Sequence, residues 1–133
     1  MMHHLNPTPR TRGFTLLELM LVVVVIAILA TVAVPTYSEF VQRSRRSDAR
    51  EALSDLAARQ EQFFLNNRYY ASTTTVLGQP ALTDRGFYNI TIPTVTTVSF
   101  TLRATALSPQ DQDTDCAVMA VTSTGVRTPA ACW

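Results

Sequence analysis

An uninterrupted apolar run near the N-terminus constrains this chain more than any other feature. Residues 14–34 contain no glycine or proline, and Glu18 is their only charged residue. As a helix rising 1.5 Å per residue, the run would span about 31 Å, which matches a hydrocarbon core of roughly 30 Å. The alternative, a buried helix of a soluble domain, rarely contains so long and apolar a run in a chain of 133 residues. The run therefore predicts a membrane-spanning helix.

The charges that flank the run and the two cysteines predict its orientation. Arg10 and Arg12 precede the run and favour a cytoplasmic N-terminus, although the arginines at 43–46 follow it and weaken this signal. Cys116 and Cys132 decide the orientation, because a cysteine pair suits an oxidising compartment beyond the membrane. We therefore expect the C-terminal part of the chain on the far side of the membrane.

A secretory signal peptide is a further alternative for the N-terminal segment. Such a peptide places its small-residue cleavage site after the apolar region. In this chain Gly13 precedes the apolar region instead. Cleavage at Gly13 would therefore leave the hydrophobic helix on the mature protein.

The stretch RGFTLLELMLVVVVIAILATVAVP resembles the prepilin signature of type IV pilins and related pseudopilins. It has a basic leader ending in glycine, then a phenylalanine, a glutamate in the fifth mature position, a long aliphatic run and a proline. The resemblance implies that residues 1–13 form a leader, which a prepilin peptidase cleaves between Gly13 and Phe14. It also implies methylation of the new amine on Phe14. The helix would first anchor the chain in the inner membrane, with a periplasmic globular domain, and would later form the core of a cell-surface pilus.

Glu18 is an acid that the membrane tolerates for physical reasons. It lies one turn inside the run, where it can reach the headgroups, and the helix dipole favours a negative charge in the first turn. In a filament, Glu18 could pair with the Phe14 amine of a neighbouring subunit and fix the axial register. The resemblance supports this role, because a glutamate at this position is the assembly residue of the family. The alternative is an incidental acid at the membrane boundary.

The helical pattern continues beyond the apolar run. Pro35 interrupts the backbone hydrogen bonds and predicts a kink without ending the helix. Asn66 and Asn67 predict the helix end. We therefore expect a membrane and filament-core segment over residues 14–35 and an amphipathic segment over residues 36–66. Its predicted apolar face consists of Ala49, Ala52, Leu53, Leu56, Ala57, Phe63 and Phe64.

The charged residues of the amphipathic segment predict a solvated face. Glu39 with Arg43 and Asp55 with Arg59 have the favourable acid-first spacing of four residues. The arginine cluster at 43–50 could bind nucleic acid or anionic headgroups, but a solvated face is favoured. The polar face carries Arg45, Asp48, Glu51, Asp55, Arg59 and Gln62.

Residues 67–133 predict a small globular β-sheet domain. A loop rich in threonine, asparagine and glycine extends to residue 86, with Tyr69 and Tyr70 expected in the core. Strands are predicted at 87–92, 97–106 and 116–122, with Pro93 between the first two and a short fourth strand that includes Val126. Short links between consecutive strands predict an antiparallel meander. The helix would cover this sheet in an α+β type IV pilin fold.

The C-terminal part predicts a disulfide and no metal site. A zinc site needs four ligands, and both histidines fall in the leader, so Cys116 and Cys132 are interpreted as a structural disulfide. Their spacing also differs from the redox C-x-x-C motif. Asp111, Asp113 and Asp115 have the spacing of a calcium loop without its glycine and distant glutamate. We therefore interpret them as a solvated acidic turn.

These observations favour a structural protein over an enzyme. The mature chain would lack histidine, and it has no glycine-rich phosphate loop, so we expect no catalytic residues, cofactor or metal. The resemblance implies a minor pilin, most like the PilE-type type IVa class, that contributes to pilus assembly, adhesion and twitching motility. Its partners would be the prepilin peptidase, other major and minor pilins, the inner-membrane assembly platform and, before assembly, membrane lipid. No small-molecule substrate is expected.

Two alternatives remain open. The first is a pseudopilin of the type II secretion system, a class that often binds calcium and lacks this terminal cysteine pair. The second is a DNA-binding minor pilin of a competence pilus. It would need a basic patch built from Arg68, Arg85, Arg103 and Arg127, and the sequence does not say whether these residues cluster. Nucleic acid is therefore not the expected partner.

Overall fold

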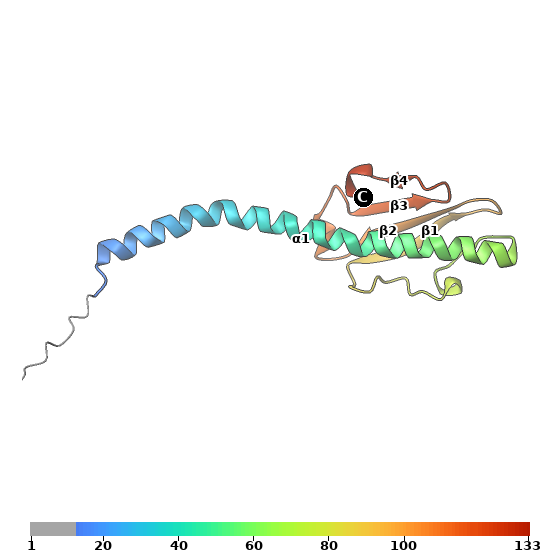
Figure 1. The fold of residues 1–133 in the computed structure, drawn as a ribbon, viewed down its shortest axis with the longest axis horizontal. Coiled ribbons are helices and arrows are strands. Elements are labelled where there is room, and N and C mark those ends of the chain that lie inside the picture. Colours follow the sequence, from blue (N-terminus) through green and yellow to red (C-terminus); the bar gives the residue numbers. More distant parts are fainter. Residues whose placement is uncertain (1–12) are drawn as a thin grey trace, which may run out of the picture. The chain divides into compact units, whose positions relative to one another are not determined.

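The computed structural model of the chain describes residues 13–133, so the leader predicted over residues 1–13 lies outside it except for Gly13. The chain divides into a first unit that ends at Tyr37 and a second unit, Ser38–Trp133. One helix, α1 (Leu16–Asn67), runs through both units (Figure 1). Pro35 lies inside α1 without ending it, as the sequence predicts. The kink expected at Pro35 stays a prediction.

Helix α1 ends at Asn67, next to a residue in the left-handed conformation. Asn67 is the final helical residue, and the Arg68 amide donates a hydrogen bond of 2.8 Å to the Phe64 carbonyl. Arg68 has a φ of 65°, the left-handed conformation that commonly terminates helices. The predicted stop at Asn66 and Asn67 is therefore confirmed.

The second unit contains a four-stranded antiparallel sheet in the order β1-β2-β3-β4. Its strands are β1 (Tyr88–Val95), β2 (Phe100–Ala106), β3 (Val118–Thr122) and β4 (Arg127–Thr128). Short 3-10 helices follow α1 (η1, Thr75–Leu77), follow β2 (η2, Gln110–Gln112) and end the chain (η3, Ala130–Cys132). Each strand pairs with the next along the chain, which confirms the predicted meander.

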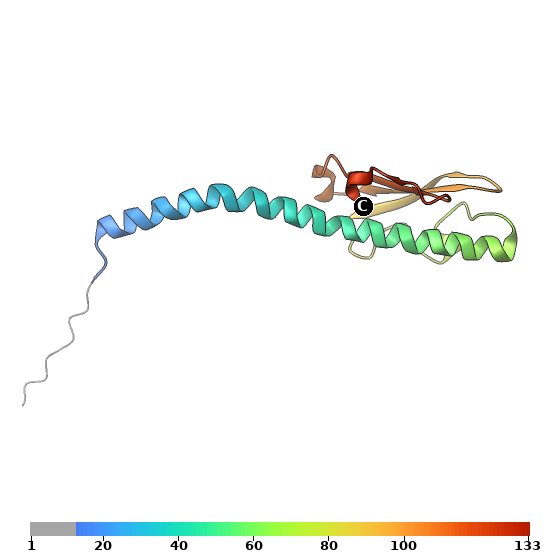
Figure 2. The same cartoon turned by 45° about the horizontal axis from the view of Figure 1, so that its top comes forward.

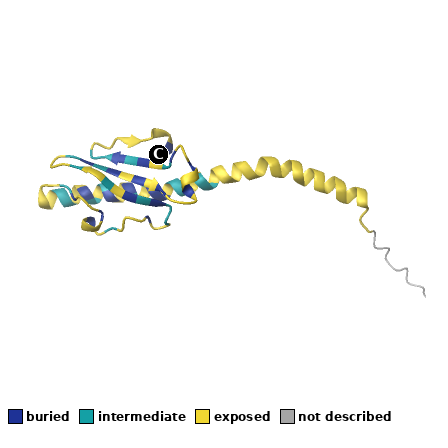
Figure 3. Cartoon of the chain, turned by 180° about the vertical axis from the view of Figure 1, so that it is seen from behind, coloured by how far each residue is buried: buried dark blue, intermediate teal, exposed yellow. Residues whose placement is uncertain are grey.

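The second half of α1 covers one face of this sheet (Figure 2). Ala49, Leu53 and Leu56 of α1 are buried in the same cluster as alternate residues of β1, β2 and β3. In β2, Leu102 and Ala104 are fully buried, whereas Arg103 between them is exposed. Figure 3 shows this buried seam between helix and sheet. The predicted apolar face and the α+β pilin fold are confirmed.

The structure corrects three details of the predicted sheet domain. Pro93 lies within β1, where the register is irregular between Thr91 and Thr94, instead of separating two strands. Proline is tolerated there because β1 is an edge strand. Val126 lies in the turn just before β4 and is 56% exposed. Tyr69 is also exposed, although its neighbour Tyr70 packs against the core as predicted.

Candidate functional site

The N-terminal end of α1 holds the residues that the prepilin motif singles out. Gly13 and Phe14 precede the helix, and Phe14 is 80% exposed. Thr15 caps the helix, because its hydroxyl accepts a hydrogen bond of 3.2 Å from the Glu18 backbone amide. A threonine followed three residues later by glutamate is the sequence signature of a capping box, and here the Thr15 hydroxyl satisfies one amide that the first turn leaves free. The sequence carried this signal, although the prediction used only the charge of Glu18.

The apolar part of α1 presents its side chains outward within the first unit. Every residue from 14 to 37 is exposed (Figure 3). The helix is long and apolar enough to cross a membrane. An unpartnered apolar surface of this size needs lipid or other helices around it, because water is a poor solvent for it. The chain therefore carries a hydrophobic helix of the kind that anchors a protein in a membrane.

The second candidate region is the C-terminal segment, and its centre is a disulfide. The structure contains the predicted bond between Cys116 and Cys132, whose Cα atoms are 5.7 Å apart. Both cysteines are almost fully buried. The bond ties η3 and the end of the chain to the residues that lead into β3. It therefore holds Trp133 against the core.

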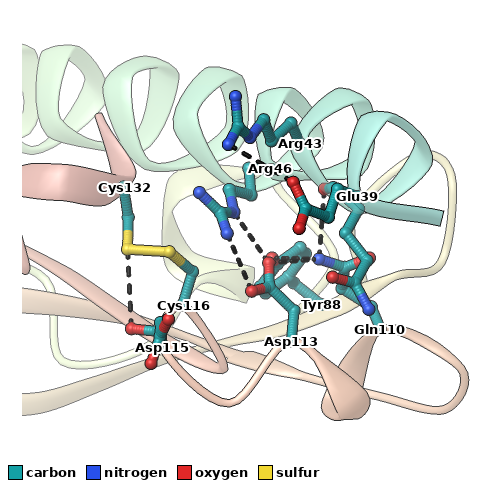
Figure 4. Close-up of polar contacts among 10 residues, drawn as sticks. Glu39, Arg43, Arg46, Tyr88, Gln110, Asp113, Asp115, Cys116 and Cys132 are labelled. Atoms are coloured by element: carbon teal, nitrogen blue, oxygen red, sulfur yellow. Dashed lines mark hydrogen bonds and ion pairs between the residues drawn. A yellow bond between two sulfur atoms is a disulfide. The ribbon is translucent and has the colours of Figure 1, made fainter. Parts of the chain in front are cut away.

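A buried polar network links this segment to α1 (Figure 4). Arg46 of α1 donates two hydrogen bonds to the Asp113 carboxylate, at 2.7 and 2.8 Å. The Gln110 side-chain amide donates to Asp113 at 3.0 Å and to the Tyr88 hydroxyl at 3.2 Å. Asp113 is only 4% exposed. The interpretation of the three aspartates as a solvated turn is therefore wrong for Asp113, which pairs with a helix residue 67 positions away.

The pKa values of two residues in this network, Arg46 and Tyr88, are both raised, for different reasons. The hydrogen bond to Asp113 raises the pKa of Arg46 above its usual value, against a smaller opposing effect of burial. Burial raises the pKa of the Tyr88 hydroxyl, because the ionised phenolate would lose its water. Asp113 therefore helps to keep Arg46 charged, whereas burial keeps Tyr88 neutral against the opposing effect of its Gln110 hydrogen bond.

A groove with basic walls lies beside the disulfide. It has a volume of about 510 Å³, and three arginines of α1 (Arg43, Arg46 and Arg50) line it together with Asp115 and Trp133. The Arg127 guanidinium stacks over the Trp133 ring with 4.9 Å between its central carbon and the ring centroid. We call this surface the basic groove. The sequence suggested a solvated arginine face, but it did not reveal that the disulfide segment lies opposite these arginines.

The four arginines considered for a nucleic-acid patch occupy different places. Arg68 follows the end of α1, and Arg85 stacks on Phe87, the residue before β1. Arg103 and Arg127 lie on opposite faces of the sheet, because Arg103 pairs with Ala120 whereas Arg127 pairs with its neighbour Val121. These four residues do not form the single patch that the sequence left open.

The comparisons with known proteins agree with the fold and with the N-terminal motif. Residues 8–34 match the family model described as "Prokaryotic N-terminal methylation motif". Residues 35–120 match the model described as "Type IV minor pilin ComP, DNA uptake sequence receptor". The chain belongs to the type IV pilin family. This pilin carries a globular domain of the ComP minor-pilin type.

Individual relatives cover the same family more broadly. The chain is 43% identical over 70 residues to the type IV major pilin protein PilA of Myxococcus xanthus, a match that covers 53% of this chain and 32% of that protein. It is 35% identical over 72 residues to the type II secretion system core protein G of Escherichia coli, covering 52% of this chain and 48% of that protein. The chain thus spans less than half the length of these relatives.

A solved pilin supports the fold itself. The structure resembles that of a type IV pilin from Shewanella oneidensis with a TM-score of 0.55 and 26% identity. This likeness covers 69% of the present chain and 97% of the other. The chain is therefore a pilin subunit, and its family consists of structural proteins.

Proposed function

We propose that this pilin is a minor subunit of a type IV pilus and contributes to pilus assembly, and through the pilus to adhesion and twitching motility. The observation that carries the proposal is the combination of a methylation-motif match with a ComP-type minor-pilin domain on one chain. The exposed apolar helix is the element that would pass from lipid into the filament core. Its expected partners are other pilins and the assembly platform of the inner membrane.

Processing at the N-terminus is part of the same proposal. A prepilin peptidase cleaves between Gly13 and Phe14, and the Phe14 amine is then methylated. Gly13 and Phe14 lie in an exposed stretch before α1, and among residues 13–133 no neighbouring atom lies within 4 Å of the place that a Cβ on Gly13 would take. The globular unit occupies the periplasm before assembly, where Cys116 and Cys132 can be oxidised.

Glu18 has two separable roles in this proposal. Its backbone amide completes the cap on Thr15, and its carboxylate pairs with the Phe14 amine of a docked subunit during assembly. Glu18→Gln keeps a side chain that suits a capping box but removes the charge. Thr15→Val removes the capping hydroxyl but keeps the charge. The two variants therefore separate helix capping from charge pairing.

The test is incorporation into filaments sheared from the native host, measured against the amount of the chain in the membrane. We expect Glu18→Gln to insert normally and to be absent from filaments, because only assembly loses a partner. Thr15→Val should enter filaments. Normal incorporation of Glu18→Gln would show that the carboxylate is incidental, and absence of the wild-type chain from all filaments would refute the pilus assignment.

A DNA-binding minor pilin is a second candidate. It is favoured by the description of the matching family as a DNA uptake sequence receptor and by the basic groove, where Trp133 offers an aromatic surface. The candidate predicts that the full chain in detergent binds a labelled duplex with an affinity that falls steeply with salt. Binding that is absent at low salt would exclude it.

A further inference from the structure

Two flanks of α1 in the globular unit carry opposite charge. The basic groove uses Arg43, Arg46 and Arg50 of α1. On the other flank lies a hollow of about 320 Å³ whose walls include four carboxylates, and we call it the acidic hollow. These carboxylates belong to Asp48, Glu51, Asp55 and Asp84.

The helix geometry makes these flanks a matched pair. Each of the three acidic residues of α1 lies five positions after one of the three arginines. The arginines are at 43, 46 and 50, and the acidic residues are at 48, 51 and 55. Five residues correspond to about 140° around a helix. Each row repeats at intervals of three and four residues, so each forms a continuous stripe along one side. The two stripes therefore face different neighbours, and the acidic stripe is displaced about 7.5 Å along the helix axis from the basic one.

Several of these charges already have partners within the chain. Arg46 binds Asp113, and Asp55 binds Arg59 at 2.7 Å. Asp48 is buried and accepts a hydrogen bond from the Thr83 hydroxyl at 2.5 Å.

Four other charges remain available to an outside partner. On the basic side, Arg43 is exposed and meets Glu39 only at 3.7 Å, while Arg50 is half-buried and forms no ion pair within residues 13–133. On the acidic side, Glu51 and Asp84 are exposed and form no ion pair within residues 13–133. The available charges are thus two arginines on one flank and two carboxylates on the other.

We propose that the basic groove of one subunit binds the acidic hollow of a second copy of this chain. The complementarity extends to the minority charges, because Asp115 lines the basic groove and Arg85 lines the acidic hollow. A contact between two different surfaces of the same protein is heterologous, and it builds an open helical assembly when its rotation does not close a ring. The two flanks thus form a lateral contact suited to a filament.

This occupant fits the groove better than a nucleic acid does. A phosphate backbone would meet the Asp115 carboxylate in the groove, and the acidic hollow would repel it. A protein flank of mixed sign satisfies both signs at once. The inference rests on the proposed function in that it describes how such a subunit meets its neighbour.

The experiment reverses charge on whole flanks, so it does not depend on which atoms meet. The first variant is Arg43→Glu with Arg50→Glu, and the second is Glu51→Arg with Asp84→Arg. The chain contains no lysine, so an amine-reactive dye labels only its N-terminal amine. Donor-labelled and acceptor-labelled full-length chains are reconstituted in phosphatidylcholine vesicles at low density, and energy transfer between them measures association.

We expect association of the wild-type chain to weaken as salt increases, because exposed charges are screened. Each double variant should associate about tenfold more weakly than wild type, because attractions between opposite charges become repulsions. A mixture of the two variants should recover association. The groove of the first variant is then acidic and attracts the hollow of the second variant, which is then basic. A chain carrying all four reversals should also recover it with itself.

The matched control is Arg68→Glu with Arg103→Glu, which changes the net charge as much as the first variant but lies off both flanks. The control should associate like wild type. Wild-type association by either double variant, failure of the mixture to recover, or an equal loss in the control would overturn the proposal. DNA binding that Arg43→Glu with Arg50→Glu abolishes, with energy transfer unchanged, would overturn it in favour of a nucleic-acid surface.

The vesicles contain no peptidase, platform or other pilin. Loss of the lateral contact is therefore observed separately from failure to enter a pilus. Filament incorporation of the wild-type chain without energy transfer in vesicles would refute only the lateral contact. Energy transfer without incorporation would refute only the pilus assignment.

Discussion

Removing the guanidinium of Arg46 should destabilise the globular unit more than any exposed charge change. The Arg46 side chain is 18% exposed and that of Asp113 is 4% exposed, so the two hydrogen bonds between them are shielded from water. Removing one partner of a buried ion pair costs about 3–5 kcal/mol, because the other charge stays buried without compensation. Arg46→Met keeps most of the apolar stem and removes only the charge. We expect a loss of stability in this range.

The assay uses Trp133, the only tryptophan, which packs against the core. Urea unfolding of the full chain in detergent, followed by its fluorescence, reports on the globular unit. Asp113→Asn and the double variant Arg46→Met with Asp113→Asn complete a double-mutant cycle. The double variant should be clearly more stable than the sum of the two single losses predicts. If each single variant loses less than about 1 kcal/mol of stability and the two losses add, Arg46 and Asp113 behave like an ordinary surface ion pair. That result would refute a stabilising role for the buried pair.

Three further predictions concern the stability of the same unit. Replacing Cys116 and Cys132 by serine should cost about 2–5 kcal/mol and speed amide exchange between them, without reducing membrane insertion. Gln60→Ala should cost about 2–4 kcal/mol by unfolding, because the fully buried Gln60 side chain satisfies both the amide and the carbonyl of Ala71, whereas exposed Gln62→Ala should cost little. The raised pKa of Tyr88 means that the folded chain holds the phenol proton more tightly than the unfolded chain does. The free energy of unfolding should therefore be unaffected by this group below about pH 10 and should decrease above it. The decrease should be smaller in Tyr88→Phe.

The sequence was informative where a pattern is local. Ala49, Leu53 and Leu56 recur at helical spacing, and all three are buried as predicted. The strand order could be predicted because strands joined by short links usually pair with their neighbours along the chain, as in an antiparallel meander. The disulfide followed from the lack of any other use for two cysteines. These features depend on neighbours along the chain, so a single sequence contains enough to predict them.

The features that were missed depend on contacts between distant residues. Arg46 and Asp113 are 67 positions apart, and nothing near either residue marks it as paired. The aspartates at 111, 113 and 115 look alike in sequence, although only Asp113 is buried. The sequence also did not show that Asp84 and Arg85 line the acidic hollow or that Asp115 lines the basic groove. The helix cap at Thr15 was also missed, although the spacing of Thr15 and Glu18 in the sequence was enough to predict it.

The most direct test of the pilin assignment is the mass of the chain recovered from filaments or membranes of its native host. Our account predicts a mature protein that begins at Phe14, with a methyl group on its amine and with Cys116 and Cys132 joined. The leader, including His3 and His4, should be absent. A mature chain that still carries those histidines would contradict the account, because an uncleaved leader leaves no Phe14 amine for Glu18 to bind.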